Sequence, residues 1–535
     1  MLDLLVRGAI VLTLDPARPT AQRLGVWRGQ IVGLDEELDG VGARASVDLG
    51  GRVVVPGFVD AHAHLAWAGA AAGALDLAGA GSVAEVLARV DAAARATPPD
   101  GWVDAVGYDQ RPLGRHLTRA DLDPVTHGRR FLAVHTSGHA QLVNTAVLEQ
   151  ITPPADGWPV GTVVAGGHPT GLFLEEASSL PAGVRSPFAV TDLVDALATA
   201  AARCAAEGVT TVAEAGVGGG LVTRSPLEGL AFQRAVASGR VPVRVVLMPS
   251  LDRVVPVDAH PADGVDAAFP LGLTSGFGSD RLRLGPVKAW LDGGMMARTA
   301  ALSAPYVGDP DGGRGALAAD LAGITRRAVA AHAGGWDLAL HAIGDRAVDA
   351  GLDIVAAAQA AHPRPEARHR IEHAGLVRPD QLARFAALGV TAVVQPRFLY
   401  EFGDAYARDM GPERAPWLYR GRSFLDAGVA LAGSSDRPVA DCAPLRAMQF
   451  LRDRTTSSGA VVGPDEPLTT EQALHAHTLG AARSLRLEDR VGSVAAGKAA
   501  DLVVLDADPR TAPDLGALEV LATVVAGEVV HGRWP

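Results

Sequence analysis

Between Val53 and about residue 485, segments rich in β-branched and apolar residues alternate with segments of helical period. Helical stretches such as DLVDALATAAARCAAEG and RPDQLARFAALG end at glycine, which commonly terminates helices. Strands that alternate with helices form parallel sheets, and eight such units predict an α/β fold, a (β/α)8 TIM-type barrel. The eight strand candidates are VVVPGFVDAHAH, GVTTVAEAG, VPVRVVLMP, RLRLGPVKAWLDG, WDLALHAIGD, HRIEHAG, GVTAVVQP and GVALAGSSD.

Two kinds of segment lie outside this alternation. Both ends of the chain, residues 1–56 and 486–535, consist of short β-rich stretches with turn residues between them. Residues 57–485 hold the predicted barrel, but roughly 140 residues separate its first two strand candidates, far more than a crossover needs. We therefore expect residues 66–190, which include FLAVHTSGHAQLVN, to form a large insertion after strand one, a lobe over the barrel mouth.

Charge and cysteine content narrow the classes of partner. The formal charge is −12, and no basic run or basic helix face is present to neutralise phosphates, so we expect neither a nucleic acid nor a membrane as partner. Cys204 and Cys442 lie far apart and form no CxxC pair, which fits a reducing cytoplasm. The expected partner is a small-molecule substrate, and the oligomeric state stays open, a homo-oligomer included.

Six ionisable side chains stand at the carboxyl ends of five predicted strands. In a parallel barrel these ends meet at one face, where the chemistry of such folds collects. A lone pair of strand-end histidines is as well explained by hydrogen bonding, but burial of all six groups together is unfavourable unless a cation compensates it. A divalent metal supplies that compensation. The six residues are His62, His64, Lys288, His341, His373 and Asp436.

Lysine usage singles out Lys288. Only Lys288 and Lys498 are lysines among 48 basic residues. Where a chain uses arginine almost everywhere, a remaining lysine is a candidate for a role that a guanidinium cannot fill. Lys288 could neutralise the nearby Asp292, or its buried amine could take up carbon dioxide and become a carbamate that bridges two metals. Because Lys288 is one of only two lysines in a chain rich in arginine, we favour the carbamate.

Several motifs resemble those of the amidohydrolase superfamily. They are PGFVDAHAH, VKAWLDGG, LHAIGDRAV, RIEHAG, VVQPRF and GSSDRPV, and together with SGHAQLVN they most resemble the amidohydrolase family 3 branch, which includes N-substituted formamide deformylases. The likeness covers nearly the whole chain, including GSVAAGKAADLVVLD, which is similar to the tail that completes the family's β-sandwich. It implies that residues 1–56 and 486–535 form one composite β-sandwich domain.

The resemblance also implies a role for each of the six residues. It implies two divalent metal ions, for which we expect Zn²⁺, with Lys288 as the N6-carboxylated bridge and Asp436 as both ligand and general base. The remaining ligands that it implies are His62, His64, His341 and His373. The chain departs from the family at DGGMMARTA, where a Ser-rich DGS.GSRTA is frequent, so the metal site should survive while the substrate preference need not follow the family.

Further residues are candidates for contact with the substrate. His139 in SGHAQLVN could stabilise an oxyanion from the inserted lobe, although a helix-capping or core role explains it as well. Aromatic and methionine side chains are usually core residues, but some here could line the substrate pocket. The pocket candidates are Trp67, Trp290, Met295 and Arg298.

These residues predict a metal-dependent amidohydrolase that cleaves a C–N bond, in an amide or N-substituted formamide, of a small, largely apolar substrate. We expect a metal-bridging hydroxide to attack the carbonyl, Asp436 to move the proton to the departing nitrogen, and His139 to brace the oxyanion. A mononuclear deaminase would leave Lys288 free, and a lactonase or other C–O hydrolase would share every ligand. The complete ligand set argues against a non-enzymatic scaffold.

Overall fold

The parallel strands that the alternation predicts are present and form two sheets. The computed structural model describes residues 1–155, 157–219, 225–260, 262, 265–309, 312–440 and 443–534. One sheet has the strand order β19-β16-β15-β8 and the other β20-β21-β22-β23-β24, and neighbouring strands in both run parallel. Each of the eight strand candidates contains at least one of these strands, so that prediction is confirmed. The strands are β8 (Phe58–Ala63), β15 (Val209–Val217), β16 (Arg244–Pro249), β19 (Leu282–Leu284), β20 (Val287–Trp290), β21 (Leu338–Ala342), β22 (Arg370–His373), β23 (Thr391–Val394) and β24 (Leu431–Gly433).

Backbone contacts join the two sheets at two places. At one, Ser250, just after the inner strand β16, pairs in parallel with Lys288 of the edge strand β20. At the other, the Asp436 N–H donates to His62 O at 2.8 Å, and the His64 N–H donates to Arg437 O at 2.9 Å. The predicted α/β class is confirmed by these sheets, while closure of all eight units into one barrel stays a prediction.

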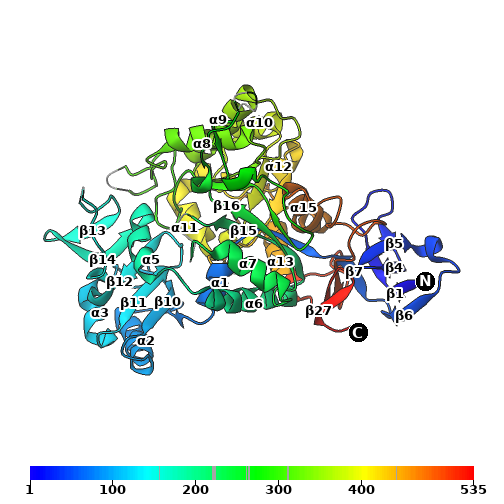
Figure 1. The fold of residues 1–535 in the computed structure, drawn as a ribbon, viewed down its shortest axis with the longest axis horizontal. Coiled ribbons are helices and arrows are strands. Elements are labelled where there is room, and N and C mark those ends of the chain that lie inside the picture. Colours follow the sequence, from blue (N-terminus) through cyan, green and yellow to red (C-terminus); the bar gives the residue numbers. More distant parts are fainter. Residues whose placement is uncertain are drawn as a thin grey trace.

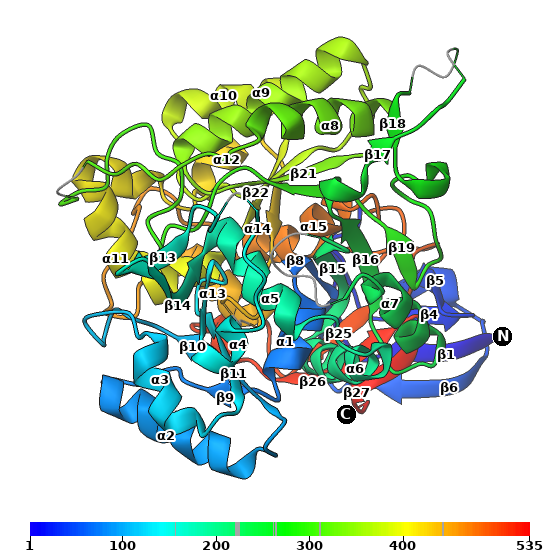
Figure 2. The ribbon, with the colours of Figure 1, turned by 60° about the vertical axis from the view of Figure 1, so that its left-hand side comes forward.

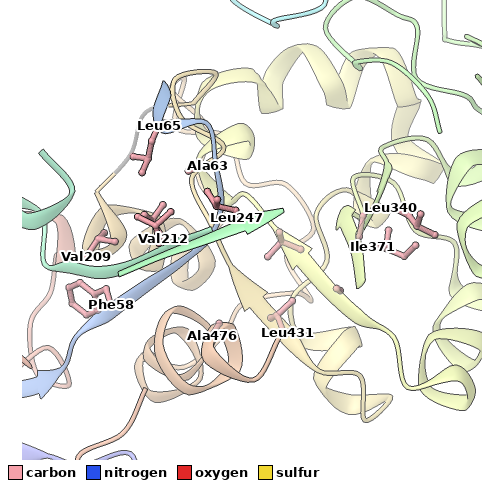
Figure 3. Packing of buried hydrophobic residues seen from close by; sticks show 14 of the residues in the cluster. Phe58, Ala63, Leu65, Val209, Val212, Leu247, Leu340, Ile371, Leu431 and Ala476 are labelled. Carbon is pink, nitrogen blue, oxygen red and sulfur yellow. The ribbon is translucent and has the colours of Figure 1, made fainter. Parts of the chain in front are cut away.

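Alternation of side chains along the strands builds two apolar clusters, one on each face. Val212 and Leu340 belong to a cluster that includes residues of helix α6 (Val190–Ala206), and Figure 3 shows part of it. Their sequence neighbours Ala213 and Ala339 belong to a second cluster. Because both faces are covered, most of these strands carry apolar residues on both faces rather than alternating apolar and polar ones.

Helices follow most of the parallel strands along the chain (Figure 1). Helix α10 (Pro379–Leu388) illustrates the local signals, since proline stands at its first position and Gly389 follows its end with a left-handed φ of 63°. Within the part of the chain that the structure describes, no helix combines the length and apolarity needed to cross a membrane. The other helices of this region are α7 (Glu228–Ala237), α8 (Leu321–Ala333), α9 (Asp345–Ala361), α11 (Pro396–Arg414), α12 (Arg422–Asp426), α13 (Pro444–Asp453), α14 (Thr470–His475) and α15 (Ala481–Ser484).

A third sheet lies within the region predicted as an inserted lobe. Its strand order is β13-β14-β12-β11-β10-β9, and Figure 1 shows it at the end of the molecule opposite both chain ends. Asn144, directly after β12, stabilises the start of β11, because its Oδ1 accepts from the Phe131 N–H at 3.1 Å and its Nδ2 donates to Arg129 O at 2.8 Å. The elements of this region are α1 (Leu65–Ala71), β9 (Leu75–Asp76), α2 (Val83–Ala96), β10 (Trp102–Tyr108), α3 (Arg119–Thr126), β11 (Arg130–His135), β12 (Ala140–Val143), α4 (Thr145–Leu148), β13 (Thr162–Ala165), β14 (His168–Leu174) and α5 (Ser179–Arg185).

Strands from both ends of the chain share one sheet. The six-stranded sheet has the order β27-β26-β25-β7-β2-β3, in which β7 near the start pairs antiparallel with β25 near the end, and a four-stranded sheet has the order β5-β4-β1-β6. Figure 2 shows these strands of the two ends next to each other. The domain limits at residues 56 and 486 and the sandwich itself stay predictions. The strands are β1 (Leu2–Arg7), β2 (Ile10–Leu12), β3 (Thr20–Ala21), β4 (Leu24–Trp27), β5 (Gln30–Leu34), β6 (Ala43–Asp48), β7 (Val53–Pro56), β25 (Leu502–Leu505), β26 (Val520–Val525) and β27 (Glu528–Gly532).

A buried ion pair ties this six-stranded sheet to the first parallel sheet. Arg244 Nε, at the start of β16, donates to Asp501 Oδ2 at 2.7 Å, and the two side chains are 6% and 1% exposed. Asp501 Oδ1 also accepts from the Ala526 N–H at 2.7 Å. Arg244→Ala leaves this carboxylate buried without its cation, so we expect the free energy of unfolding to fall by about 3–5 kcal/mol.

Urea unfolding checks this expectation against a matched exposed pair. Arg7 and Asp48 also form an ion pair, at 3.3 Å, but their side chains are 55% and 51% exposed. Arg7→Ala is therefore expected to lower the free energy of unfolding by at most about 1 kcal/mol. Equal losses in the two variants would show that burial of the Arg244 pair does not stabilise the fold.

Candidate metal centre

The six strand-end side chains meet in one small cavity of about 30 Å³. The parallel register brings this about, because it sets Trp290 beside His341 and Ala342 beside His373 on neighbouring strands. Each of the six residues is at most 5% exposed. The residues that the sequence predicted and that line the cavity are His62, His64, Lys288, His341, His373 and Asp436.

Asp436 lies between the two histidines of the first strand. Its Oδ1 is 3.1 Å from His64 Nε2 and 3.4 Å from His62 Nε2. One ligand atom from each of the three residues lies within 4.8 Å of the other two. Asp436 has a left-handed φ of 57°, which is unfavourable for a residue with a side chain and is held here by its N–H bond to His62 O.

His341 and His373 approach the same space from the second sheet. Their ring centroids are 4.4 Å apart, and the His373 ring is 5.2 Å from that of His62. Gln395 Oε1 accepts a hydrogen bond from His373 Nδ1 at 2.8 Å, and Gln395 Nε2 donates to Ser434 Oγ at 2.9 Å. This chain of bonds fixes the ring of His373 and leaves its Nε2 as the ligand atom.

A buried ion pair fixes His62 in the same way. Glu372 Oε2 accepts from His62 Nδ1, and the same carboxylate accepts from Arg370 Nε and Nη2. Burial disfavours the ionised form, but the Arg370 guanidinium and His62 hold the pKa of Glu372 well below its usual range. The ionised carboxylate therefore keeps the proton of His62 on Nδ1, so that Nε2 is free to bind a metal.

Burial keeps three imidazoles of the cavity neutral, those of His62, His341 and His373. It lowers the pKa of His62 to about 3 and the pKa of His373 to about 4. It also holds the pKa of His341 well below its ordinary value. The neutral imidazole is the form that coordinates a metal ion.

Lys288 presents a buried amine that lacks an acceptor. Among the residues that the structure describes, neither Lys288 Nζ nor His62 Nε2 has a hydrogen-bond partner, and burial lowers the pKa of Lys288 to about 8. Asp292, the alternative partner considered above, instead accepts three backbone N–H groups at 2.8–3.0 Å. A buried amine without an acceptor and a buried imidazole nitrogen without a donor, next to neutral imidazoles and a carboxylate, fit a divalent cation.

His139 lines the same cavity from the inserted region. Its Nδ1 donates to Glu175 Oε2 at 2.8 Å, and Thr299 Oγ1 donates to the other oxygen of Glu175. Burial alone would lower the pKa of His139, but the Glu175 carboxylate outweighs it and raises the pKa. A protonated imidazole at this position can donate from Nε2 toward the cavity.

Two of the four candidates for the substrate pocket line the cavity, and the other two do not. Trp67 and Trp290 line the cavity with the six residues. Met295 is 1% exposed and belongs to an apolar cluster with Tyr306 instead. Arg298 forms an ion pair with Asp409 at 2.6 Å and lines a different pocket.

Three residues that support the cavity were not among the sequence candidates. They are Glu372, Gln395 and Glu175, which bind the Nδ1 atoms of His62, His373 and His139. Glu372 could have been noticed as a carboxylate next to His373, near the end of the strand candidate HRIEHAG. Gln395 could have been noticed by the rule used for the six residues, because it is a polar residue at the end of the strand candidate GVTAVVQP. Glu175 lies in the inserted region and carries no comparable signal.

Comparison with known proteins places the chain in a family. A relative, N-substituted formamide deformylase from Arthrobacter pascens, is 30% identical over 100% of this chain and 99% of its own. Protein LONG AFTER FAR-RED 3 from Arabidopsis thaliana is 30% identical over 99% of this chain and 91% of its own. The crystal structure of an uncharacterized metal-dependent hydrolase from Pyrococcus horikoshii is 27% identical, with a TM-score of 0.76 over 96% of this chain and 99% of that one. Because the amidohydrolase family model matches residues 45–531, the chain belongs to the amidohydrolase family.

Proposed function

We propose that this protein is a metal-dependent hydrolase that cleaves the C–N bond of an amide or N-substituted formamide in a small, largely apolar molecule. The observation that carries the proposal is the convergence of four imidazoles, a buried amine and a carboxylate on one cavity. The name of the Arthrobacter pascens relative supports the bond and the substrate class. The name of the Pyrococcus horikoshii structure supports a metal.

In this proposal the six side chains hold two divalent cations, Zn²⁺, with Lys288 as a carbamate. The Lys288 nitrogen bonds to the carbon of carbon dioxide and loses a proton, a reaction that a pKa of about 8 assists because part of the amine is neutral near pH 7. When bound, such cations acidify a water molecule and polarise a substrate carbonyl.

Asp436 and His139 carry out the proton transfers and the stabilisation of charge. Despite burial, the imidazoles around Asp436 hold its pKa below its ordinary value, so the carboxylate is ionised and accepts the proton of the attacking water. It then donates this proton to the departing nitrogen. His139 is positioned by Glu175 and donates from Nε2 to the carbonyl oxygen as negative charge develops there.

A mononuclear deaminase is the second candidate. It is favoured by the compact group of His62, His64 and Asp436, whose ligand atoms lie within 4.8 Å of one another without Lys288. A metal content near one ion per chain and an unmodified Lys288 would support it. A lactonase would use the same side chains, so assays with esters and lactones separate it.

The proposal extends to the architecture and setting of the site. We propose that the two parallel sheets close into one barrel, that residues 1–56 and 486–535 form one β-sandwich, and that residues 66–190 cover the site. We propose a small-molecule substrate with neither nucleic acid nor membrane as partner. The cytoplasmic location rests on the two distant cysteines, of which Cys442 lies outside the described residues.

Purified protein loaded with zinc should hydrolyse formamides or acyl amides. We expect turnover, measured as release of amine, with at least one N-substituted formamide, the class that the name of the Arthrobacter pascens relative gives, and lower turnover with lactones. Hydrolysis of lactones alone would contradict the bond assignment. Metal-containing protein inactive on all three classes would contradict the proposed function.

Lys288→Ala should lose metal and activity together. The change removes the only side chain of the six that can form a carbamate, so a small carboxylic acid that enters the space should restore part of the turnover. Metal content by elemental analysis and kcat with and without added acetate measure both effects. Lys498→Ala is the matched control, because the other lysine donates to Ser493 Oγ at 2.6 Å in a turn and should keep full metal content. Full activity in Lys288→Ala would contradict the bridge.

Asp436→Asn should lower kcat by about 10³-fold, because an amide cannot accept the proton of water. Elemental analysis shows whether Asp436→Asn still binds its metal, and so separates the loss of the general base from the loss of the metal. Asp409→Asn is the control, since Asp409 pairs with Arg298 outside the cavity. If Asp436→Asn binds metal and keeps its turnover, Asp436 is not the general base.

A further inference from the structure

A pocket with charged walls lies at the end of the parallel strands opposite to the candidate metal centre. Its volume of about 330 Å³ is within the range of small-molecule sites. Arg244 is the first residue of β16 and Arg281 directly precedes β19, whereas the candidate ligands stand at the carboxyl ends of such strands. Within the described part of the chain, the pocket shares no lining residue with the cavity of the six candidate ligands.

Segments that lie far apart in the chain form the wall of this pocket. They are the turn between β4 and β5, the starts of β16 and β19, residues 489–499 and the turn between β26 and β27. We call the space the arginine-lined pocket, because most of its charged wall residues are arginines. The charged residues are Arg28, Arg244, Asp280, Arg281, Asp489 and Arg490. No basic run in the sequence could have indicated this cluster, because its members come from separate segments.

Two of the four arginines have carboxylate partners. Arg244 pairs with the buried Asp501 at 2.7 Å. Arg490 pairs with Asp280, which belongs to the same wall. These two guanidiniums are therefore compensated within the protein.

The other two arginines, Arg28 and Arg281, form no ion pair among the residues that the structure describes. Arg281 is half-buried, and its Nη2 donates to Pro242 O at 2.6 Å. The Arg28 guanidinium lies 4.6 Å from the centroid of the Trp27 ring. Neither contact supplies the full negative charge that compensates a partly buried guanidinium.

Arg281 also lies close to a second guanidinium. Burial and the charge of Arg244 lower the pKa of Arg281, against the charges of Asp501 and Glu528. Like charges at partly buried positions are unfavourable beside each other, and an anion bound between them removes the repulsion.

The remaining acid of the wall does not balance these charges. Asp489 is exposed and lies near Lys498, because burial lowers the pKa of that amine and the charge of Asp489 opposes the shift. The pocket thus keeps an excess of positive charge in a chain whose formal charge is −12. A guanidinium presents a planar fork of N–H donors that fits the oxygens of a phosphate group.

We infer that the arginine-lined pocket binds a small phosphate-bearing anion, either inorganic phosphate or a phosphate monoester, through Arg281 and Arg28. Near neutral pH a phosphate group carries up to two negative charges, which match the two guanidiniums without partners. The bound anion connects the turn between β4 and β5 with the first parallel sheet. The site is independent of the proposed hydrolysis, because it lies at the other end of the strands.

Calorimetry on the full-length protein at low salt tests the inference. We expect inorganic phosphate or phenyl phosphate to bind wild type with a Kd of about 1 mM or below, and Arg281→Gln to weaken that binding by about tenfold or more. Arg28→Gln, at an exposed position in a turn, should act in the same direction and serves if the first variant folds poorly. Tighter binding of phenyl phosphate identifies a monoester as the ligand, and equal affinities identify phosphate itself.

Arg283→Gln is the matched control. Arg283 lies two residues further along, is also half-buried, and donates from Nη2 to Gly276 O at 3.3 Å, but it is not part of the pocket wall. Its phosphate Kd should therefore stay within about threefold of that of wild type. Equal affinities in wild type and in folded Arg281→Gln and Arg28→Gln would overturn the inference. So would succinate binding as tightly as phosphate, or no binding of either phosphate compound at about 10 mM.

Lys288→Ala separates this pocket from the metal centre, where phosphate could also bind. The variant is expected to lose its metal but should keep the phosphate affinity of wild type. If Lys288→Ala loses the binding and Arg281→Gln keeps it, phosphate binds at the metal centre and the inference falls. Because these measurements follow binding rather than turnover, their result stands whether or not the protein hydrolyses an amide.

Thermal unfolding gives a second readout. A ligand that binds only the folded state raises Tm, so phosphate should raise the Tm of wild type and of Arg283→Gln but not that of Arg281→Gln. An equal rise in all three proteins would contradict the assignment of the anion to Arg281.

Discussion

The burial of six ionisable side chains in one cavity is the constraint on which the rest of the structure depends. Each group removed from water is unfavourable in its charged form unless a partner compensates it. The protein meets this in part by keeping the imidazoles neutral, as the pKa of about 3 for His62 shows. In part it uses charges, since the Glu372 carboxylate that binds His62 is paired with Arg370, and despite burial the imidazoles around Asp436 hold the pKa of its carboxyl below the ordinary value. What remains uncompensated is the pair of nitrogens on Lys288 and His62, where a cation fits.

The sequence predicted the strands and the six cavity residues because both follow from local rules. A buried parallel strand is a short apolar run, and the residue at its carboxyl end lies at the same face as those of its neighbours. Composition added a second kind of information, since only two lysines are present. One, Lys498, donates to Ser493 Oγ in a turn, while the other, Lys288, is buried without an acceptor. The closure of the barrel does not follow from such rules, because it depends on contacts between strand edges far apart in the chain.

The partners of the supporting residues could not be predicted for the same reason. Glu372 stands 310 positions from His62, and Glu175 stands 36 positions from His139, so no local pattern connects either pair. The surroundings of loop residues could not be predicted from the sequence either, as Met295 and Arg298 show. The loop after β20 turns Met295 into an apolar cluster and Arg298 toward Asp409, and strand alternation does not extend to such positions.

The site is built from two structural sources that tolerate change differently. The candidate ligands stand on or just after parallel strands whose register is fixed by hydrogen bonds to neighbouring strands, so a shift of one strand would displace its ligand relative to the others. The larger pocket that adjoins the cavity through Trp67 and Val439 is lined by α1, α6 and α11, by the inserted region and by the turn after Asp436. Helix α1 follows His64 directly and is held by Glu214 of β15, which accepts the Ala66 N–H at 3.2 Å. Side chains further along α1 can therefore vary without moving the ligands, whereas changes in the turn after Asp436 act on pocket and ligand together.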